Sequence, residues 1–311
     1  MAEVTLREVG LRDGLQAEER VLSPEEKAAL LQALRDTGLS RLEVTSFVHP
    51  RAIPQLGDAE AFLDVAEKPP GQVWSALVPN RRGAERAAAR PIVDEWTFFL
   101  SASERHNQAN VRMSVEASMR AAAEVADAAQ GAGRRTSAVV ATSFVCPYAG
   151  PTPPGDVVGL ARRLFALGYR TLLFGDTIGA ASPTMVRRLV RELRDALPDA
   201  ELGLHFHNTR GQAPANALAG FAEGVRLFDG SIGGMGGCPY APGATGNVAT
   251  EDLAWLFEAE GHATGLDLAR LARAARTAET LVGRRLPGAV MRTFDAAPGG
   301  GGRGDAPWPS S

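Results

Sequence analysis

The sequence has few cysteines, no long apolar run and no excess of positive charge. Its only two cysteines, Cys146 and Cys238, cannot form a disulfide framework, so a reducing cytoplasm is the expected location. No run approaches the roughly 18 apolar residues of a membrane span, and the N-terminus lacks the segments of a secretory signal. The formal net charge is −3, so we expect no membrane partner and no nucleic-acid partner.

What the sequence does contain is an alternation of short β-rich runs and longer helical patterns. Hydrophobic residues make up 45% of the chain, enough for a sizeable core. Eight strand candidates, each followed by a helical pattern, span residues 4–9, 41–46, 73–78, 93–100, 136–142, 171–174, 202–206 and 225–229. This alternation predicts a closed (β/α)₈ TIM barrel. An open doubly wound sheet is the alternative, but no GxGxxG follows the first strand.

Capping residues mark where several helices begin. Ser23, Pro24 and Glu26 form a capping-box start for a helix that is expected to stop at Gly38. Further helices are expected from about residues 58, 81, 114, 154, 182, 212 and 250, and an extra one over 266–282. We therefore expect a single barrel domain over residues 1–290 and a tail over 291–311. The Gly/Pro-rich end of this tail, from residue 298, is expected to be largely disordered.

Polar residues stand at or just after several of the predicted strands. In a TIM barrel the active site lies at the C-terminal ends of the strands, so these residues should meet on one rim. They are Arg12 and Asp13 after the first strand, Glu43 in the second, Asp176 after the sixth, His205 and His207 at the end of the seventh, and Cys238 and Asn247 after the eighth.

The two histidines predict a metal site. Side chains alternate across a strand, so His205 and His207 share a face and can offer two imidazoles to one ion. With the Asp13 carboxylate they could hold zinc or iron as well. A carbonyl oxygen from Asn247 would make a mixed N/O site, which favours Mg²⁺ or Mn²⁺. The alternative is a pair of polar residues that form hydrogen bonds at a strand exit.

Arg12 and Cys238 are the candidates for catalysis. A guanidinium beside a divalent cation is repelled unless an anion lies between them, so we expect substrate oxygens to bridge Arg12 and the metal. The alternative is a structural ion pair with Glu43 or Asp176. Cys238 lies in a glycine-rich loop, where a thiol could move over a bound substrate and transfer a proton. It could also be incidental, and Cys146 is expected simply to pack.

Five stretches of the sequence carry most of these residues: EVGLRDGLQ (8–16), LEVTSFVHPRAIPQLGD (42–58), GDTIG (175–179), LHFHNTRGQAPANALAG (204–220) and GGCPYAPGATGNVATEDL (236–253). Together they resemble the 3-hydroxy-3-methylglutaryl-CoA lyase family of metal-dependent TIM-barrel lyases. The resemblance implies metal-dependent cleavage of the acyl-CoA substrate 3-hydroxy-3-methylglutaryl-CoA to acetyl-CoA and acetoacetate. It also implies leucine breakdown as the usual pathway and a homodimer as the usual assembly.

The resemblance assigns roles to residues on the rim. The metal ligands that it implies, for Mg²⁺ or Mn²⁺, are Asp13, His205, His207 and Asn247. The catalytic residues that it implies are Arg12 for the enolate, Glu43 as an acidic partner, Cys238 for a proton and Asp176 near the substrate hydroxyl. Substrate contacts are expected from Gln16, Thr177, His49 and Asn110.

Four positions depart from the family pattern. Asn208 stands where Asp is usual, next to the proposed ligands, and His49 stands where Ser is usual. The run HNQANVRM (106–113) replaces a lysine-bearing segment, and Glu18-Glu19 stand where relatives often carry a lysine. A different acyl group, or a substrate without CoA, is therefore an alternative.

Three alternative functions compete with the lyase interpretation: a condensing synthase, a non-catalytic barrel and an aldolase. A condensing synthase of the same superfamily usually reads REGxQ after the first strand, whereas this chain reads RDGLQ. A non-catalytic barrel would be expected to lack at least one of the rim residues, and all are present. An aldolase that acts on a free hydroxy acid or ketoacid stays open.

Overall fold

Eight parallel strands close into a barrel, in the order β1-β10-β9-β8-β5-β4-β3-β2. The structure is a computed structural model that describes residues 3–237 and 246–294. The barrel strands are β1 (Thr5–Glu8), β2 (Arg41–Ser46), β3 (Val73–Leu77), β4 (Glu95–Ser101), β5 (Arg135–Ala141), β8 (Thr171–Asp176), β9 (Glu201–Phe206) and β10 (Leu227–Gly230). The predicted TIM barrel is confirmed, and each strand lies within a few residues of its predicted position.

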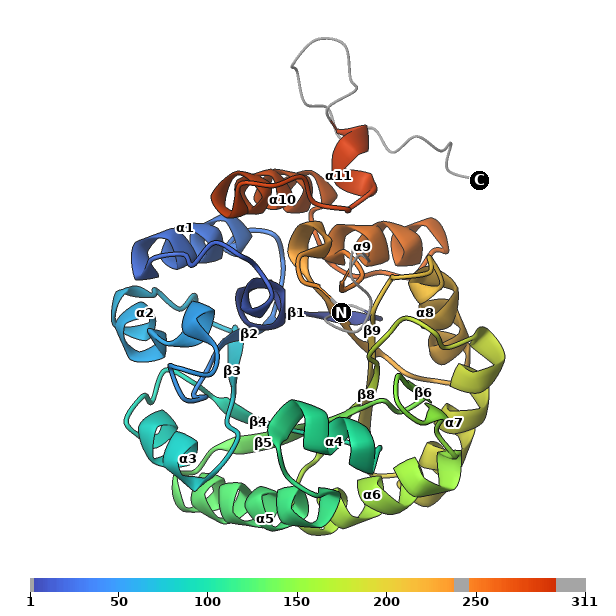
Figure 1. Cartoon of the computed structure of the whole chain (residues 1–311). Helices are drawn as coiled ribbons and strands as arrows, with labels where there is room; N and C mark the ends of the chain where they lie inside the picture. The colour runs from blue at the N-terminus through green and yellow to red at the C-terminus, as the bar shows by residue number, and fades with distance from the viewer. Residues whose placement is uncertain (1–2, 238–245, 295–311) are drawn as a thin grey trace.

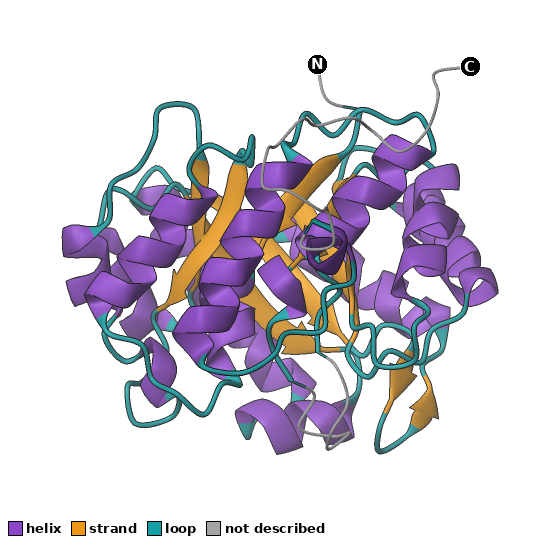
Figure 2. Cartoon of the chain, turned by 90° about the horizontal axis from the view of Figure 1, so that it is seen from above, coloured by secondary structure: helices purple, strands orange, loops and turns teal. Residues whose placement is uncertain are grey.

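A ring of helices surrounds the barrel, as the view down its axis shows (Figure 1). They are α1 (Pro24–Leu34), α2 (Ala59–Val65), α3 (Arg81–Ala88), α5 (Val115–Gly131), α6 (Pro154–Ala166), α7 (Pro183–Ala196), α8 (Ala213–Ala222) and α9 (Thr250–Ala259). The predicted extra helix is α10 (Leu268–Val282), which packs outside the ring against α1 and α9. In the side view the strands lie inside a layer of helices (Figure 2). No helix within residues 3–237 and 246–294 is long and apolar enough to cross a membrane.

The start of α1 is as predicted, but its end is not. The Ser23 hydroxyl accepts a hydrogen bond from the Glu26 amide at 3.2 Å, and the Glu26 carboxylate accepts one from the Ser23 amide at 2.8 Å. The helix ends at Leu34, four residues before Gly38. The Thr37 hydroxyl donates to the Leu34 carbonyl at 2.7 Å, so this carbonyl is satisfied without another helical turn.

Several short elements were not predicted. They are the π-helix η1 (Gly10–Gly14), the 3₁₀ turns η2 (Pro54–Leu56) and η3 (Ile232–Gly234), the hairpin of β6 (Val145–Cys146) and β7 (Gly150–Pro151), and the helices α4 (Glu104–Val111) and α11 (Val290–Thr293). The sequence of α4, ERHNQANV, has no apolar period for the core to select. Figure 1 shows α4 inside the outer ring, in front of the barrel. The predicted tail beyond α11, residues 295–311, lies outside the described residues.

Candidate active site

The turn after β1 brings the first two candidate residues into the barrel mouth. In η1 the amides of Arg12 and Asp13 both donate to the Val9 carbonyl, at 3.1 and 2.8 Å. The Glu8 carboxyl fastens this turn, since its Oε1 accepts from the amides of Gly10 and Ile232 at 2.7 and 2.9 Å. A Cβ on Gly10 would lie 2.5 Å from that oxygen, so only glycine leaves room for this contact.

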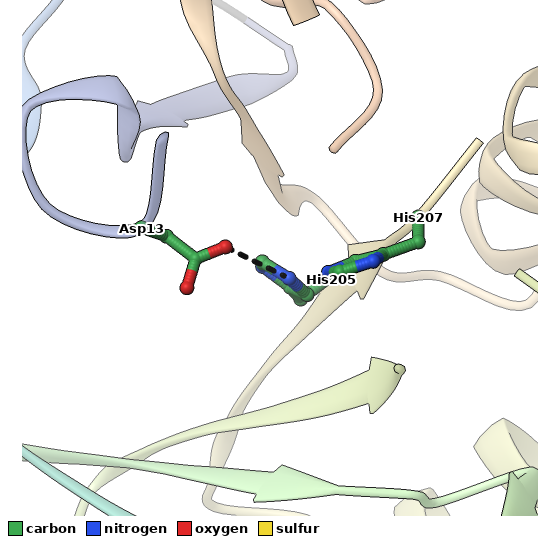
Figure 3. A group of neighbouring side chains, drawn as sticks. All are labelled: Asp13, His205 and His207. Carbon is green, nitrogen blue, oxygen red and sulfur yellow. Dashed lines mark ion pairs between the residues drawn. The ribbon is translucent and has the colours of Figure 1, made fainter. Parts of the chain in front are cut away.

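Asp13, His205 and His207 form one cluster at the mouth of the barrel. One ligand atom from each lies within 4.8 Å of the other two. Figure 3 shows the Asp13 carboxylate directed toward the imidazole of His205, with His207 beside it. The His205 Nε2 is 3.9 Å from Asp13 Oδ2, and the two side chains are only 10% and 13% exposed. The predicted convergence of these residues is present in the structure.

Asn247 joins this cluster through both its backbone and its side chain. Its backbone pairs with that of His207 in an isolated β-bridge, and its Nδ2 donates to Asp13 Oδ2 at 2.8 Å. Within the described part of the chain, Asn247 Oδ1 and His207 Nδ1 are buried without a hydrogen-bond partner. Buried acceptors are rarely left unpaired. A carboxylate, two imidazoles and an amide oxygen therefore fit a divalent cation with mixed N/O ligands.

Arg12 forms ion pairs with Glu43 and with Asp13. Its Nε donates to Glu43 Oε2 and its Nη1 to Asp13 Oδ1, both at 2.5 Å. Glu43 is fully buried and Arg12 is 4% exposed. Of the two alternatives for a structural ion pair, the one with Glu43 is present, and Asp176 is not a partner. Glu43 thus holds the guanidinium of Arg12 beside the cluster, and the third nitrogen of that group, Nη2, takes part in neither of these two ion pairs.

Burial and neighbouring charges set the ionisation of the cluster. Burial raises the pKa of Asp13, but Arg12 and the two histidines outweigh it and lower that pKa well below its usual range. Burial, together with the charge of His205, lowers the pKa of His207 to about 4. At neutral pH Asp13 is therefore ionised and His207 is neutral, which are the forms that bind a metal ion.

A cavity of about 110 Å³ opens next to the cluster. Seven predicted residues line it: Arg12, Asp13, Gln16, Asn110, Thr177, His205 and His207. Gln16 also donates to Asp13 Oδ1 at 2.9 Å. A larger cavity, of about 250 Å³, lies at the other end of the barrel beside Thr5, Glu201 and Leu227. None of the candidate residues lines that cavity, so the candidate active site is the smaller one.

Of the predicted residues that the structure describes, Glu43, Asn247, Asp176 and His49 do not line the cavity. Asp176 is fully buried, and its carboxylate accepts from the amides of Ala180 and Ala181 at 2.9 and 3.0 Å. Burial raises the pKa of Asp176. His49 is exposed, and its Nδ1 accepts from the Arg51 amide at 3.2 Å. Cys238 lies outside the described residues, but the preceding residue, Gly237, does line the cavity.

The departures at Asn208 and Glu18 have structural explanations. Asn208 Oδ1 accepts from the Ala213 amide at 3.2 Å, at the start of α8, and so acts away from the histidines. The Glu18 carboxylate pairs with Arg284 Nε and Nη2 at 2.7 and 2.5 Å. It also accepts from the Gly236 amide at 3.4 Å. Glu18 therefore joins the turn after β1 to the stem of the glycine-rich loop.

Sequence reasoning missed two groups of residues at this site. The first group lines the cavity: Phe99 on β4, Val139 and Ala141 on β5, and His106 on α4. The only signal for the three strand residues is a position near the end of a strand, because apolar residues there look like ordinary core. His106 begins the run 106–113 noted above, but no role was predicted for it. His106 sits in the helix that was not predicted, and burial lowers its pKa to about 4. The second is a single residue, Asp229, whose Oδ2 is 3.0 Å from His205 Nδ1. Its signal is an acid inside the apolar run VRLFDG.

Several known proteins that are similar to this chain are named as lyases. The family model described as HMGL-like matches residues 3–278. A hydroxymethylglutaryl-CoA lyase of Bacillus subtilis is 42% identical over 95% of this chain and 98% of its own length. A Pseudomonas aeruginosa relative is named 3-hydroxy-3-isohexenylglutaryl-CoA/hydroxymethylglutaryl-CoA lyase. It is 39% identical over 91% of this chain and 94% of its own length.

A solved structure has the same fold over nearly the whole chain. It is an HMG-CoA lyase from Acinetobacter baumannii in complex with coenzyme A and 3-methylmalate. The TM-score is 0.88 at 37% identity, and the match covers 98% of both chains.

Proposed function

This chain belongs to the hydroxymethylglutaryl-CoA lyase family, whose chemistry is carbon–carbon bond cleavage, and we propose that it converts 3-hydroxy-3-methylglutaryl-CoA to acetyl-CoA and acetoacetate. One observation carries the proposal. Asp13, His205 and His207 cluster beside a buried arginine at the mouth of a TIM barrel. Asn247 binds Asp13, and its Oδ1 has no hydrogen-bond partner among the described residues. The bound coenzyme A in the related Acinetobacter structure supports an acyl-CoA substrate.

The reaction needs charge at two points of the substrate. The C3 hydroxyl loses its proton to a base, the C2–C3 bond breaks, and its electron pair moves into the thioester as an enolate. C3 becomes the ketone of acetoacetate. One proton then returns to C2 and gives acetyl-CoA, so no proton is gained or lost overall. An enzyme for this step must therefore acidify the hydroxyl and stabilise the enolate oxygen.

The residues at the mouth of the barrel match these two requirements. Asp13, His205, His207 and Asn247 would hold Mg²⁺ or Mn²⁺, and such an ion lowers the pKa of a hydroxyl placed against it. Arg12 is assigned to the enolate oxygen, because its guanidinium is buried and held in place before the substrate arrives. Glu43 keeps Arg12 at that position.

Proton transfer and substrate contacts complete the assignment. Cys238 is our candidate for handling a proton, because Gly237, which precedes it, lines the cavity. Gln16, Thr177 and Asn110 are assigned to the substrate because they line the same cavity. Asp176 is assigned to shaping the loop that carries Thr177, since its carboxylate binds amides of that loop.

The proposal is tested by the turnover of 3-hydroxy-3-methylglutaryl-CoA. Acetoacetate should form with Mg²⁺ or Mn²⁺, disappear after EDTA treatment and return when the metal is restored. Cys238→Ala should lose turnover and keep metal binding. No acetoacetate from metal-loaded protein would contradict the substrate assignment. Analogues with longer 3-alkyl groups, as in the name of the Pseudomonas relative, and the free hydroxy acid would be assayed next. The expected homodimer and cytoplasmic location stay predictions for gel filtration and cell fractionation.

A further inference from the structure

Three neighbouring strands place an arginine, an aspartate and a metal-site histidine in one row. The register of the barrel pairs Arg7 on β1 with Asp229 on β10, and Asp229 with His205 on β9. Side chains at paired positions of parallel strands stand on the same face of the sheet. The row therefore leads from β1 to the cluster that contains Asp13 and His207.

The contacts along this row are short and well aligned. Arg7 Nε and Nη2 donate to Asp229 Oδ1 and Oδ2, both at 2.8 Å, which is the bidentate geometry of a strong ion pair. Asp229 Oδ2 is also 3.0 Å from His205 Nδ1. Asp229 and Arg7 are each 2% exposed. Neither residue lines the cavity, so we expect neither to contact the substrate.

The arrangement leaves only one ring nitrogen of His205 for the site. A carboxylate can only accept, so the Nδ1 beside Asp229 must carry a proton. The lone pair is then on Nε2, the atom that lies 3.9 Å from Asp13 Oδ2. His207 differs, because within the described residues its Nδ1 has no hydrogen-bond partner. The two histidines therefore differ in their environment. The ring of His205 is held by Asp229 on the side away from Asp13, and His207 has no equivalent contact at its Nδ1 within the described residues.

We propose that Arg7 and Asp229 are positioning residues for His205: Asp229 fixes its ring and tautomer, and Arg7 fixes Asp229. This inference rests on the metal site of the proposed function. Carboxylates that hold a ligating histidine typically account for about 10–100-fold in metal affinity. Arg7 acts one contact further away, so the effect of its loss should be smaller.

The test measures Mn²⁺ affinity without substrate, by electron paramagnetic resonance of the free ion. Asp229→Asn should weaken Mn²⁺ binding by about 10–100-fold, and Arg7→Met by about tenfold or less. The matched control is Glu60→Gln. Glu60 takes part in another bidentate pair, in which Arg86 Nε and Nη2 donate at 2.6 and 2.8 Å on the outside of the barrel. This control should lower the thermal stability of the fold without changing Mn²⁺ affinity.

The double variant Arg7→Met with Asp229→Asn separates positioning from stability. Each single change leaves a buried charge without its partner, whereas the double change removes both. We expect the melting temperature to recover toward the parent value while Mn²⁺ affinity stays low. In the Mg²⁺-loaded parent, the Nδ1–H of His205 should give a downfield proton resonance, which can be resolved because the chain has only five histidines. Asp229→Asn should shift or remove that resonance.

Three results would overturn the inference. One is parent-like Mn²⁺ affinity in folded Asp229→Asn, with metal-dependent turnover intact in the parent. In that case the proposed function would stand and the positioning role would be wrong. Another is recovery of Mn²⁺ affinity together with stability in the double variant, because it would show a purely structural role. A parent chain that binds no Mn²⁺ would overturn this inference and the metal site together.

Discussion

The two halves of the cavity wall differ in chemistry. On the side of β1 and β9 the wall carries Arg12, Asp13, His205 and His207. The side chains that β4 and β5 themselves contribute are apolar: Phe99, Val139 and Ala141. Helix α4, which follows β4, adds the polar residues His106 and Asn110. The charged half can bind the oxygens of a β-hydroxy thioester and stabilise developing charge. The apolar side chains of β4 and β5 offer no hydrogen bond, so they should govern which acyl chain fits. Rate and specificity are thus assigned to opposite walls of one cavity.

The largest effect should come from removing the central residue of the charged half. Asp13 contacts Arg12, Gln16 and Asn247 as well as the metal site. Loss of the metal ion's stabilisation is worth several kcal/mol, so Asp13→Ala should lower kcat/KM by about 10³-fold or more. Steady-state kinetics together with Mn²⁺ titration would check this. Substantial turnover in a variant that binds no metal would refute the assignment.

Arg12→Gln should break the charged half without emptying its metal site. Removal of one preorganised donor to a developing oxyanion costs about 10²–10³-fold in kcat. Mn²⁺ affinity should change little, because Arg12 is not a proposed ligand. The conservative Arg12→Lys keeps the charge and should recover part of kcat. If the metal affinity fell as steeply as kcat, Arg12 would instead be acting through Asp13.

The apolar half should respond in KM and substrate preference. Val139→Ala removes two methyl groups from the wall and so enlarges the cavity. Ala141→Val, at the end of the same strand, adds two methyl groups and narrows the cavity. One methylene in such a pocket is worth about 10–200-fold in discrimination. We expect Val139→Ala to favour 3-hydroxy-3-alkyl substrates with longer chains and Ala141→Val to disfavour them. Competition between 3-methyl and 3-isohexenyl thioesters measures this. Equal changes for both substrates would place the acyl group elsewhere.

The smallest effect concerns stability and comes from a buried acid that supports the turn η3. The Glu251 carboxylate accepts from the Gly233 amide at 3.0 Å. Burial, aided by Asp252, raises its pKa from 4.5 to about 8. The folded chain then keeps a proton that the unfolded chain loses, so stability falls as pH rises from about 4.5 to about 8.

Glu251→Gln cannot ionise and should escape this loss. Its free energy of unfolding relative to the parent should increase from pH 5 to pH 8, by on the order of 2 kcal/mol. Urea unfolding at several pH values measures the difference. A difference that is independent of pH would mean that Glu251 is already ionised in the folded protein.

The sequence predicted the barrel and its rim well, for physical reasons. Each strand is an apolar run between helical patterns, so the strands could be located in the sequence. The C-terminal ends of the strands of a parallel barrel lie on one rim, so the proximity of Asp13, His205 and Asn247 could also be predicted. Helix α4 could not be predicted, because its sequence, ERHNQANV, has no apolar period. The pair of Arg7 and Asp229 depends on strand register, which alternation of residues does not reveal. The sequence did not identify Phe99, Val139 and Ala141 as cavity residues, because apolar residues on a strand look the same as residues of the hydrophobic core.

We expect one divalent cation to be held by Asp13, His205, His207 and Asn247. An anomalous difference map from crystals grown with Mn²⁺ would locate it. We predict a single strong peak at the barrel mouth, within bonding distance of the Asp13 carboxylate, both imidazoles and Asn247 Oδ1. A peak elsewhere, or none in protein that turns over substrate, would contradict it.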